Sequence, residues 1–202
     1  MIFNIFKFLK SGSYQKKRSQ TANWNMMKKY LVNTSNLLDL GCDVGEYCFN
    51  AEKIKLMSIG IDGNLKNIEN AERQKKLINS NAIFIRQDLN LDFIKKLPKF
   101  ENIICLSVYH HFVRKFGEFK SEEMIKEILE KTEKNFFFQI SSKDNKYKNK
   151  LNFRFDQSVS KTDMYINKIF KGFKNISIFN LGKKIENPPI ENFRILYLIK
   201  KN

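Results

Sequence analysis

The sequence has few of the residues on which disulfide frameworks and metal sites depend. Its 202 residues include two histidines and three cysteines, Cys42, Cys48 and Cys105, and no Cys-x-x-Cys spacing occurs. An odd number of widely spaced cysteines is typical of reduced thiols in a cytoplasmic protein. We therefore expect a cytoplasmic location, no disulfides and no bound metal.

Long apolar runs are also missing. The longest, at 103–109 and 136–140, have the length of β-strands and are far too short to span a bilayer. The first ten residues are mostly apolar, but they lack the basic start and the small-residue cleavage site of a secretion signal. This pattern predicts no stable membrane insertion, with an amphipathic surface helix at 1–10 as the alternative.

Acidic residues are scarce beside basic ones, 21 against 37, which gives a net charge of +16. The excess is concentrated at 1–31, with seven positive residues and no acid, and at 143–174, with nine positive and three negative residues. Only six of the basic residues are arginine, the usual reader of phosphates and guanine edges. Nucleic acid is therefore one interpretation of the charge, and a lysine-rich, AT-rich codon usage is the other.

The alternation of short apolar runs with charged amphipathic stretches predicts an α/β fold. The length suits one domain, and we expect a basic, partly helical segment at 1–30 followed by an α/β domain at 31–202. The expected strands are 36–40, 57–61, 82–86, 102–108, 135–140, 175–179 and 193–199. The expected helices are 22–31, 45–55, 64–78, 91–97, 121–132 and 161–170, with Ser121 as a helix cap and 143–152 as a mobile loop.

This order of elements predicts a doubly wound, seven-stranded sheet. Only thirteen residues separate 179 from 193, and they include Gly182 and the Pro188-Pro189 pair. A helical crossover needs a dozen or more residues, most of them helical, so it will not fit here. The last strand should therefore run antiparallel to the sixth.

Residues 37–45 read Leu-Leu-Asp-Leu-Gly-Cys-Asp-Val-Gly, an apolar strand followed by a turn with two glycines. Glycine lets the backbone approach a ligand closely, and the acid Asp62 at the end of the next strand can accept hydrogen bonds from two ribose hydroxyls. Together they predict a nucleoside pocket at the carboxyl ends of neighbouring strands. The Gly-x-x-x-Gly spacing differs from the Gly-x-Gly-x-x-Gly of nicotinamide dehydrogenases.

With the reversed last strand, these motifs resemble the class I S-adenosylmethionine-dependent methyltransferases over about residues 30–200. The matching segments are 37–45, Gly60-Ile61-Asp62-Gly63-Asn64, Arg86-Gln87-Asp88-Leu89, and Ile104-Cys105-Leu106-Ser107-Val108-Tyr109-His110-His111-Phe112. The resemblance implies a Rossmann-like fold, S-adenosyl-L-methionine as the cofactor, and methyl transfer as the reaction.

The resemblance also implies a set of cofactor-binding residues. Asp39 would orient the ammonium group, Gly41 and Gly45 would admit the methionine part, and Asp43 stands where many relatives have a third glycine. Asp62 would hold the ribose. The adenine would lie against Gly63, Asn64, Asp88 and the backbone N–H of Leu89, and Ser107 would line the floor of the pocket.

His110 and His111 follow the fourth strand, where the active site of this family opens. A histidine with an ordinary pKa near 6.5 can take a proton from an attacking hydroxyl or amine, which makes the pair the catalytic candidates. The alternative is that the pair only shapes the pocket. Two neighbouring histidines on a strand would point in opposite directions, so at most one should reach the substrate. Tyr14, Arg18, Trp24, Arg114 and residues 139–143 are further candidates for the substrate side.

The acceptor is less well determined. No Asn-Pro-Pro-Phe or Asp-Pro-Pro-Tyr motif follows the fourth strand, which disfavours DNA as the substrate. We expect methylation of oxygen or nitrogen on a small molecule. The alternatives are an RNA methyltransferase, supported by the basic surface, and a non-catalytic S-adenosylmethionine-binding subunit, suggested by Asp43 and the scarcity of acid–base residues.

Overall fold

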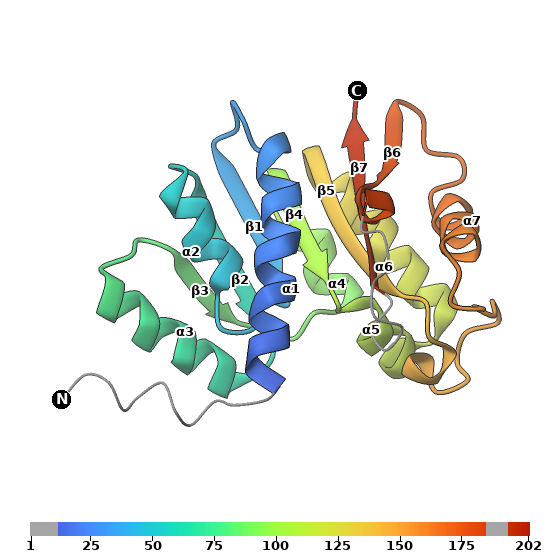
Figure 1. Cartoon of the computed structure of the whole chain (residues 1–202), viewed down its shortest axis with the longest axis horizontal. Helices are drawn as coiled ribbons and strands as arrows, with labels where there is room; N and C mark the ends of the chain where they lie inside the picture. The colour runs from blue at the N-terminus through green and yellow to red at the C-terminus, as the bar shows by residue number, and fades with distance from the viewer. Residues whose placement is uncertain (1–11, 185–193) are drawn as a thin grey trace.

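The computed structural model describes residues 12–184 and 194–202, and its centre is a mixed seven-stranded sheet (Figure 1). The strand order is β3-β2-β1-β4-β5-β7-β6. The strands are β1 (Asn36–Leu40), β2 (Met57–Asp62), β3 (Ile83–Arg86), β4 (Phe100–Leu106), β5 (Thr132–Ser141), β6 (Ile176–Asn180) and β7 (Arg194–Lys201). Strands β1 to β5 pair in parallel, and β7 runs antiparallel between β5 and β6. The doubly wound α/β sheet and its reversed last strand are thus confirmed.

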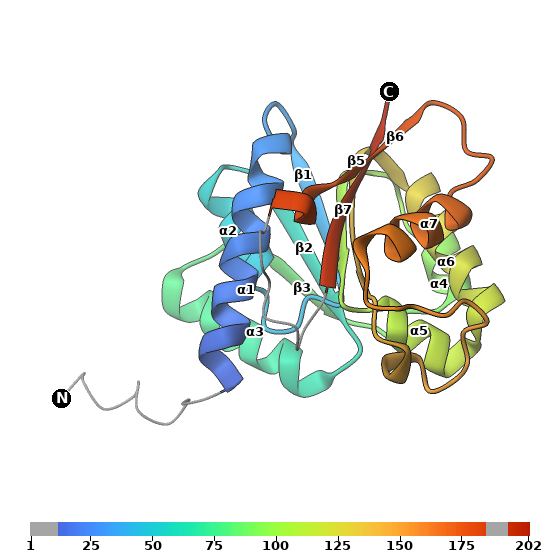
Figure 2. The same ribbon diagram turned by 45° about the vertical axis from the view of Figure 1, so that its right-hand side comes forward.

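Helices cover both faces of this sheet. They are α1 (Gly12–Met27), α2 (Glu46–Lys53), α3 (Leu65–Ile78), α4 (Leu91–Lys96), α5 (Tyr109–Phe116), α6 (Glu118–Glu130) and α7 (Val159–Ile169), with short 3-10 turns η2 (Lys28–Tyr30), η3 (Asp144–Tyr147) and η4 (Leu181–Lys184). The turned view separates α1, α2 and α3 on one side of the sheet from α4 to α7 on the other (Figure 2). No helix within the described ranges has the length and apolar character needed to cross a bilayer.

The core forms as two layers because successive side chains of a strand point to opposite faces. Leu38, Ile103 and Phe136 belong to the cluster that packs against α4 to α7. Their neighbours Leu37 and Ile104 belong to the cluster that contains Trp24 and Met27 of α1. A sheet buried on both faces needs near-continuous apolar strands, which is the pattern that β1 and β4 have.

Three local expectations are wrong. The fourth strand ends at Leu106 rather than at 108, and the helix α5 begins three residues later, at Tyr109. Ser121 is not a helix cap, because α6 starts at Glu118 and the Ser121 hydroxyl donates to the carbonyl of Gly117. The stretch 143–152 is anchored rather than a free loop, since Tyr147 and Leu151 are buried.

The Tyr147 hydroxyl also donates to the carbonyl of Ser141, at 2.5 Å. Apolar residues scattered among lysines therefore fix this stretch beneath α5. The amphipathic segment 1–10, the Pro188-Pro189 pair and the expected strand start at Phe193 lie outside the described residues.

Candidate functional site

The predicted site residues meet at the carboxyl ends of the parallel strands. Strand β1 pairs with β2 on one side and with β4 on the other, so the chain order reverses there. Open α/β sheets bind ligands at such a switch point. The Gly41 N–H donates to the carbonyl of Ile61 at 2.8 Å, which joins the glycine turn to the end of β2.

The glycine turn depends on glycine at both ends. Gly41 has a φ of +80° and Gly45 a φ of +83°, in the left-handed region that disfavours other residues. A Cβ on Gly41 would overlap Val108 Cγ2, and one on Gly45 would lie 2.5 Å from the Phe84 ring. Both glycines are therefore needed for packing as well as for conformation.

Asp43 occupies the position where many relatives have a third glycine. Its φ of 53° is left-handed, and aspartate is one of the few non-glycine residues that adopt this conformation readily. The turn therefore keeps its backbone path without the third glycine.

The carboxylate of Asp62 is held firmly at the end of β2. It accepts the backbone N–H of Asp43 at 2.9 Å and that of Asn64 at 2.8 Å, and the side-chain amide of Asn67 lies at 3.4 Å. An ionised carboxylate has about four acceptor positions, so capacity remains on Oδ2. The geometry suits an acid that accepts hydrogen bonds from a ligand hydroxyl.

Asp39 has the most unusual environment in the site. The side chain is 2% exposed, and its Oδ2 has no hydrogen-bond partner. Burial, together with the negative charges of Asp62 and Asp43, raises the pKa of Asp39 to about 8. A buried carboxyl oxygen without a partner is costly, and a cation placed against it would remove that cost. Asp39 therefore fits the ammonium group of an amino-acid ligand.

The ends of β2 and β3 form the adjoining side. A Cβ on Gly63 would lie 2.5 Å from Asp88 Oδ1, so these two turns touch. The Asn64 side chain accepts the N–H of Lys66 at 3.0 Å and caps α3. Asp88 is exposed and forms an ion pair of 3.4 Å with Lys115 of α5, while Leu89 is half-buried. The predicted adenine-side residues are thus adjacent in space.

Ser107 and the histidines border the other side of the turn. Ser107 has a left-handed φ of 61°, and its hydroxyl donates to Gln139 Oε1 at 3.0 Å. His110 is buried and His111 exposed, and their ring centroids lie 4.2 Å apart. The expected strand position of His110 and His111 is wrong, because both residues lie on the helix α5.

Both histidines have lowered pKa values. Burial, and then the charges of His111, Arg194, Arg114 and Lys146, lower the pKa of His110 to about 3. Burial and the same three cations also lower the pKa of His111, although the charge of Asp62 opposes the shift. The Arg114 guanidinium lies 3.3 Å from His111 Nδ1. The pair is therefore neutral at pH 7.

One further residue, Arg194, reaches this site and has no signal in the sequence. Its guanidinium donates to the Ser107 hydroxyl. The antiparallel register of β7, in which Arg194 lies opposite Ser141, brings it to the carboxyl edge. Among the other substrate-side candidates, Trp24 is buried in the core, while Arg114 and Gln139 lie beside the histidines and Ser107.

The described part of the chain gives no sign of a metal centre. Cys42, Cys48 and Cys105 are all free and buried. No three His, Cys, Asp or Glu side chains of residues 12–184 and 194–202 come together as ligands. The site chemistry within those ranges is that of carboxylates, amides, imidazoles and cations.

Neither the family models nor the curated proteins compared with the sequence give a match. Solved structures do. The magnesium protoporphyrin IX methyltransferase ChlM from Synechocystis PCC 6803 with bound SAM has a TM-score of 0.62 and 16% identity, over 94% of this chain and 80% of that one.

Two other methyltransferases are similar. The plantazolicin methyltransferase BpumL, in complex with a desmethylPZN analog and SAH, has a TM-score of 0.59 and 13% identity, over 96% of this chain and 86% of its own. WbdD, a bifunctional kinase-methyltransferase, is similar over 92% of this chain and 39% of its own, with a TM-score of 0.64 and 18% identity. The chain therefore has the class I S-adenosylmethionine-dependent methyltransferase fold.

Proposed function

We propose that the protein is an S-adenosylmethionine-dependent methyltransferase that methylates oxygen or nitrogen of a small-molecule acceptor. The observation that carries this proposal is the buried, unpartnered Oδ2 of Asp39 beside the glycine turn. A nucleoside-binding acid, Asp62, lies on the neighbouring strand, and its charge acts on Asp39. An ammonium group and a ribose on one ligand would satisfy both acids.

The strand order gives this ligand a direction. Asp88 and Leu89 follow β3 and would hold the adenine, Asp62 ends β2 and would hold the ribose, and Asp39 on β1 would hold the ammonium. The acceptor would then lie over the ends of β4 and β5, beside Ser107 and the histidines. S-adenosylmethionine supplies a methyl group on a good leaving group, so these residues mainly need to align the acceptor.

In this proposal His110 and His111 shape the acceptor pocket as neutral rings. A histidine whose pKa is about 3 is a weak base at pH 7, which applies to His110. Arg114 donates toward Nδ1 of His111, so the neutral ring carries its proton on Nε2 and presents a hydrogen-bond donor. Such a donor can orient an acceptor oxygen without removing a proton.

The similar solved structures support a small-molecule acceptor over DNA. The names of ChlM and BpumL give magnesium protoporphyrin IX and plantazolicin as what those enzymes methylate. The free, buried cysteines support a cytoplasmic location. RNA, attracted by the basic surface, and a non-catalytic cofactor-binding subunit are the competing functions.

Calorimetric titration with S-adenosylhomocysteine and with NAD tests the cofactor. We expect the wild type to bind S-adenosylhomocysteine and not NAD. Asp39→Asn and Asp62→Asn should each weaken binding about 10- to 100-fold, since a charged hydrogen bond contributes roughly 1.5–3 kcal/mol. Glu69→Gln is the matched control, because Glu69 lies on α3 and forms an exposed ion pair with Arg73 of the same helix. Binding of NAD alone would contradict the proposal.

Turnover separates the enzyme from a cofactor-binding subunit. The protein should convert S-adenosylmethionine to S-adenosylhomocysteine with at least one member of a panel of hydroxylated and amino acceptors. Mass spectrometry of the acceptor should show one added methyl group. Tight S-adenosylhomocysteine binding with no methyl transfer to any acceptor would favour the non-catalytic subunit.

A further inference from the structure

Three cations from three different elements lie on the side of the site that carries the histidine pair: Arg114 contacts His111, Arg194 contacts Ser107, and Lys146 lies on η3, which packs against α5. Arg114 lies on α5, Lys146 on η3 and Arg194 at the start of β7. The charges of all three act on both imidazoles. We call Arg114, Lys146 and Arg194 the cationic triad.

No member of the triad forms an ion pair with another described residue. Elsewhere the chain does pair its lysines with acids. Lys168, for example, lies 3.0 Å from both Glu118 and Glu122. Like charges gathered at one place repel one another, and here they also depress the pKa of two histidines. The acceptor side of the site is therefore complementary to a negative charge.

Hydrogen bonds hold two guanidinium groups of the triad, those of Arg194 and Arg114. Arg194 donates to the Ser107 hydroxyl, which in turn donates to Gln139 Oε1 at 3.0 Å, and Gln139 is buried. Lys150 Nζ donates to the carbonyl of Arg114 at 2.7 Å, which ties the stretch after η3 to α5. A guanidinium held by a strand and a hydroxyl can present its remaining N–H groups to carboxylate or phosphate oxygens.

We propose that the cationic triad binds an anionic group, a carboxylate or a phosphate, of the methyl acceptor. This inference rests on the proposed function, because it assigns the triad to the acceptor side of the methyl-transfer site. The anion screens the three cations and lies beside Ser107 and the His110–His111 pair. The neutral histidines carry no charge of their own, and the Nε2–H of His111 can donate a further hydrogen bond to the anion.

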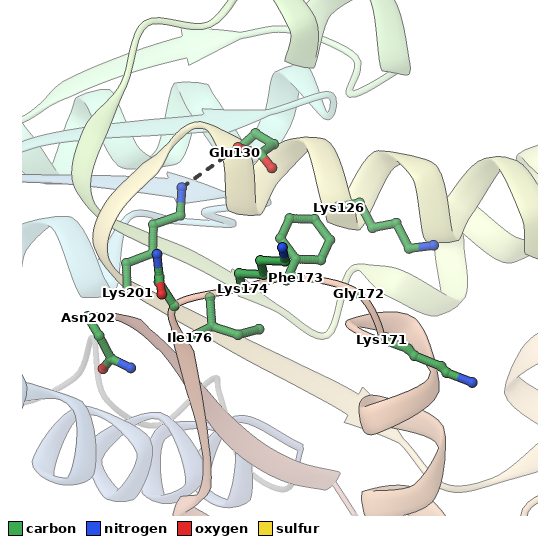
Figure 3. Close-up of a pocket in the computed structure, with 10 residues that line it drawn as sticks. Lys126, Glu130, Lys171, Gly172, Phe173, Lys174, Ile176, Lys201 and Asn202 are labelled. Carbon is green, nitrogen blue, oxygen red and sulfur yellow. Dashed lines mark ion pairs between the residues drawn. The ribbon is translucent and has the colours of Figure 1, made fainter.

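A small anionic acceptor suits this geometry better than RNA does. The triad lies beside one pair of histidines, and Arg194 is held there by its hydrogen bond to the Ser107 hydroxyl. Non-specific binding to a nucleic acid backbone instead uses charges spread along a groove. A second basic hollow exists, but it lies between the end of α6, the segment before β6 and the end of β7 (Figure 3). It is lined by residues that include Lys126, Glu130, Lys171, Lys174, Lys201 and Asn202.

The strand register separates the two basic places. Arg194 lies opposite Ser141, the last residue of β5, whereas Lys200 lies opposite Asn135 near the beginning of β5. In the hollow of Figure 3, Lys201 is paired with Glu130 at 3.9 Å. Lys174→Gln is therefore a matched control, because this substitution removes one positive charge from the hollow and leaves the triad unchanged.

The two histidines make the test direct, because the chain contains no others. Inorganic phosphate and sodium acetate are titrated separately into protein saturated with S-adenosylhomocysteine, at constant ionic strength set with sodium chloride. The imidazole resonances of His110 and His111 are followed by NMR. We expect saturable shifts with at least one of the two anions, and a rise in the pKa of both histidines as the bound anion offsets the cations.

Substitutions identify the cations responsible. Arg194→Gln should weaken anion binding about tenfold or more. Arg194→Lys should weaken it less, and Lys174→Gln should leave the anion affinity unchanged. S-adenosylhomocysteine affinity is measured for every variant and should not change. If the wild type does not bind S-adenosylhomocysteine, the proposed function is contradicted. If every variant binds it as the wild type does, a change in anion affinity is due to the triad alone.

Three results would overturn the triad's role while leaving the proposed function intact. One is the absence of any saturable shift with phosphate and with acetate. Another is equal anion affinity in Arg194→Gln and in the wild type. The third is a shift produced only by a short RNA oligonucleotide, with an affinity that falls steeply with salt, since this would assign the surface to RNA.

Discussion

At the scale of single residues, the role proposed for Asp39 would couple ligand binding to protonation. Its pKa of about 8, caused by burial and by the neighbouring acids, means that the carboxyl group is largely protonated at neutral pH in the free protein. An ammonium ligand requires the ionised form. Binding must therefore release a proton from Asp39, and it becomes easier as pH rises.

This predicts a specific pH dependence of S-adenosylhomocysteine affinity. The association constant should increase by up to tenfold per pH unit between pH 6 and 8 and then level off. Asp39→Asn should bind weakly and show little dependence over the same range. Calorimetry in buffers of different ionisation enthalpy should detect the released proton in the wild type alone. A wild-type affinity that is flat between pH 6 and 8 would show that Asp39 is already ionised.

Gly45 offers a second test at this scale, because two separate effects exclude a side chain there. Its left-handed φ disfavours alanine, and the added Cβ would collide with Phe84. Gly172 has a similar φ of +97° but open space around it. Gly45→Ala should lower the free energy of unfolding by about 2–4 kcal/mol, and Gly172→Ala by only about 1 kcal/mol. Urea unfolding of both variants measures the difference, and equal losses would show that the turn shifts to accommodate Cβ.

At the scale of elements, α5 is the helix that carries the histidines, and a buried polar link fixes it. The hydroxyls of Tyr109 and Tyr165 lie 2.8 Å apart, which joins α5 to α7. The Tyr165 hydroxyl also lies 3.2 Å from Glu122, which is in contact with Lys168. The link therefore runs from the buried side of α5 to charged groups at the surface.

Tyr165→Phe should break this link. We expect a loss of about 1–3 kcal/mol in the free energy of unfolding, because the Tyr109 hydroxyl is left buried without its partner. Tyr30→Phe is the control, since Tyr30 is partly exposed and its hydroxyl has no hydrogen bond to another described residue. Urea unfolding measures both. If Tyr165→Phe is as stable as Tyr30→Phe, water replaces the missing hydroxyl.

The sheet could be predicted because its signals are local. Apolar runs such as that of β1 and the turn at 41–45 each lie within a few residues. Helix α5 could not be predicted, because it is eight residues long and its N-cap, Val108, makes no side-chain capping hydrogen bond. Its helical state depends on contacts with the adjacent α6 and with β5 and η3, which are more remote in sequence. Propensity alone does not decide such a segment.

The site residues likewise fall into those placed by local sequence and those placed by contacts remote in sequence. Asp39, Gly41, Gly45 and Asp62 are recognisable because a strand and the turn after it place them. Arg194 was not recognisable, because it reaches Ser107 across 87 residues and only the register of β7 against β5 brings them together. The lowered pKa of His110 likewise depends first on burial and then on cations from three elements, which spacing in the sequence does not reveal.

At the scale of the whole molecule, Asp39 and His110 give stability opposite pH dependences. The folded-state pKa of Asp39, about 8, lies above its ordinary value of 3.8. Its contribution is therefore complete below pH 4 and is lost as pH rises to 8. The folded-state pKa of His110, about 3, lies below its ordinary value of 6.5. Its contribution is complete above pH 6.5 and is lost as pH falls to 3.

The two dependences cancel between about pH 4 and 6.5, because one slope is the reverse of the other. Replacing one of the two residues should therefore reveal, in the difference from the wild type, the pH dependence of stability that this residue contributes. The stability of Asp39→Asn relative to the wild type should rise by about 1–3 kcal/mol between pH 6.5 and 8, and that of His110→Gln should rise as pH falls from 6.5 to 3. Urea unfolding at several pH values gives these difference curves. Saturating S-adenosylhomocysteine should remove the alkaline decline from the wild type, because the ligand holds Asp39 ionised; a decline that persists unchanged in Asp39→Asn would have to come from another group.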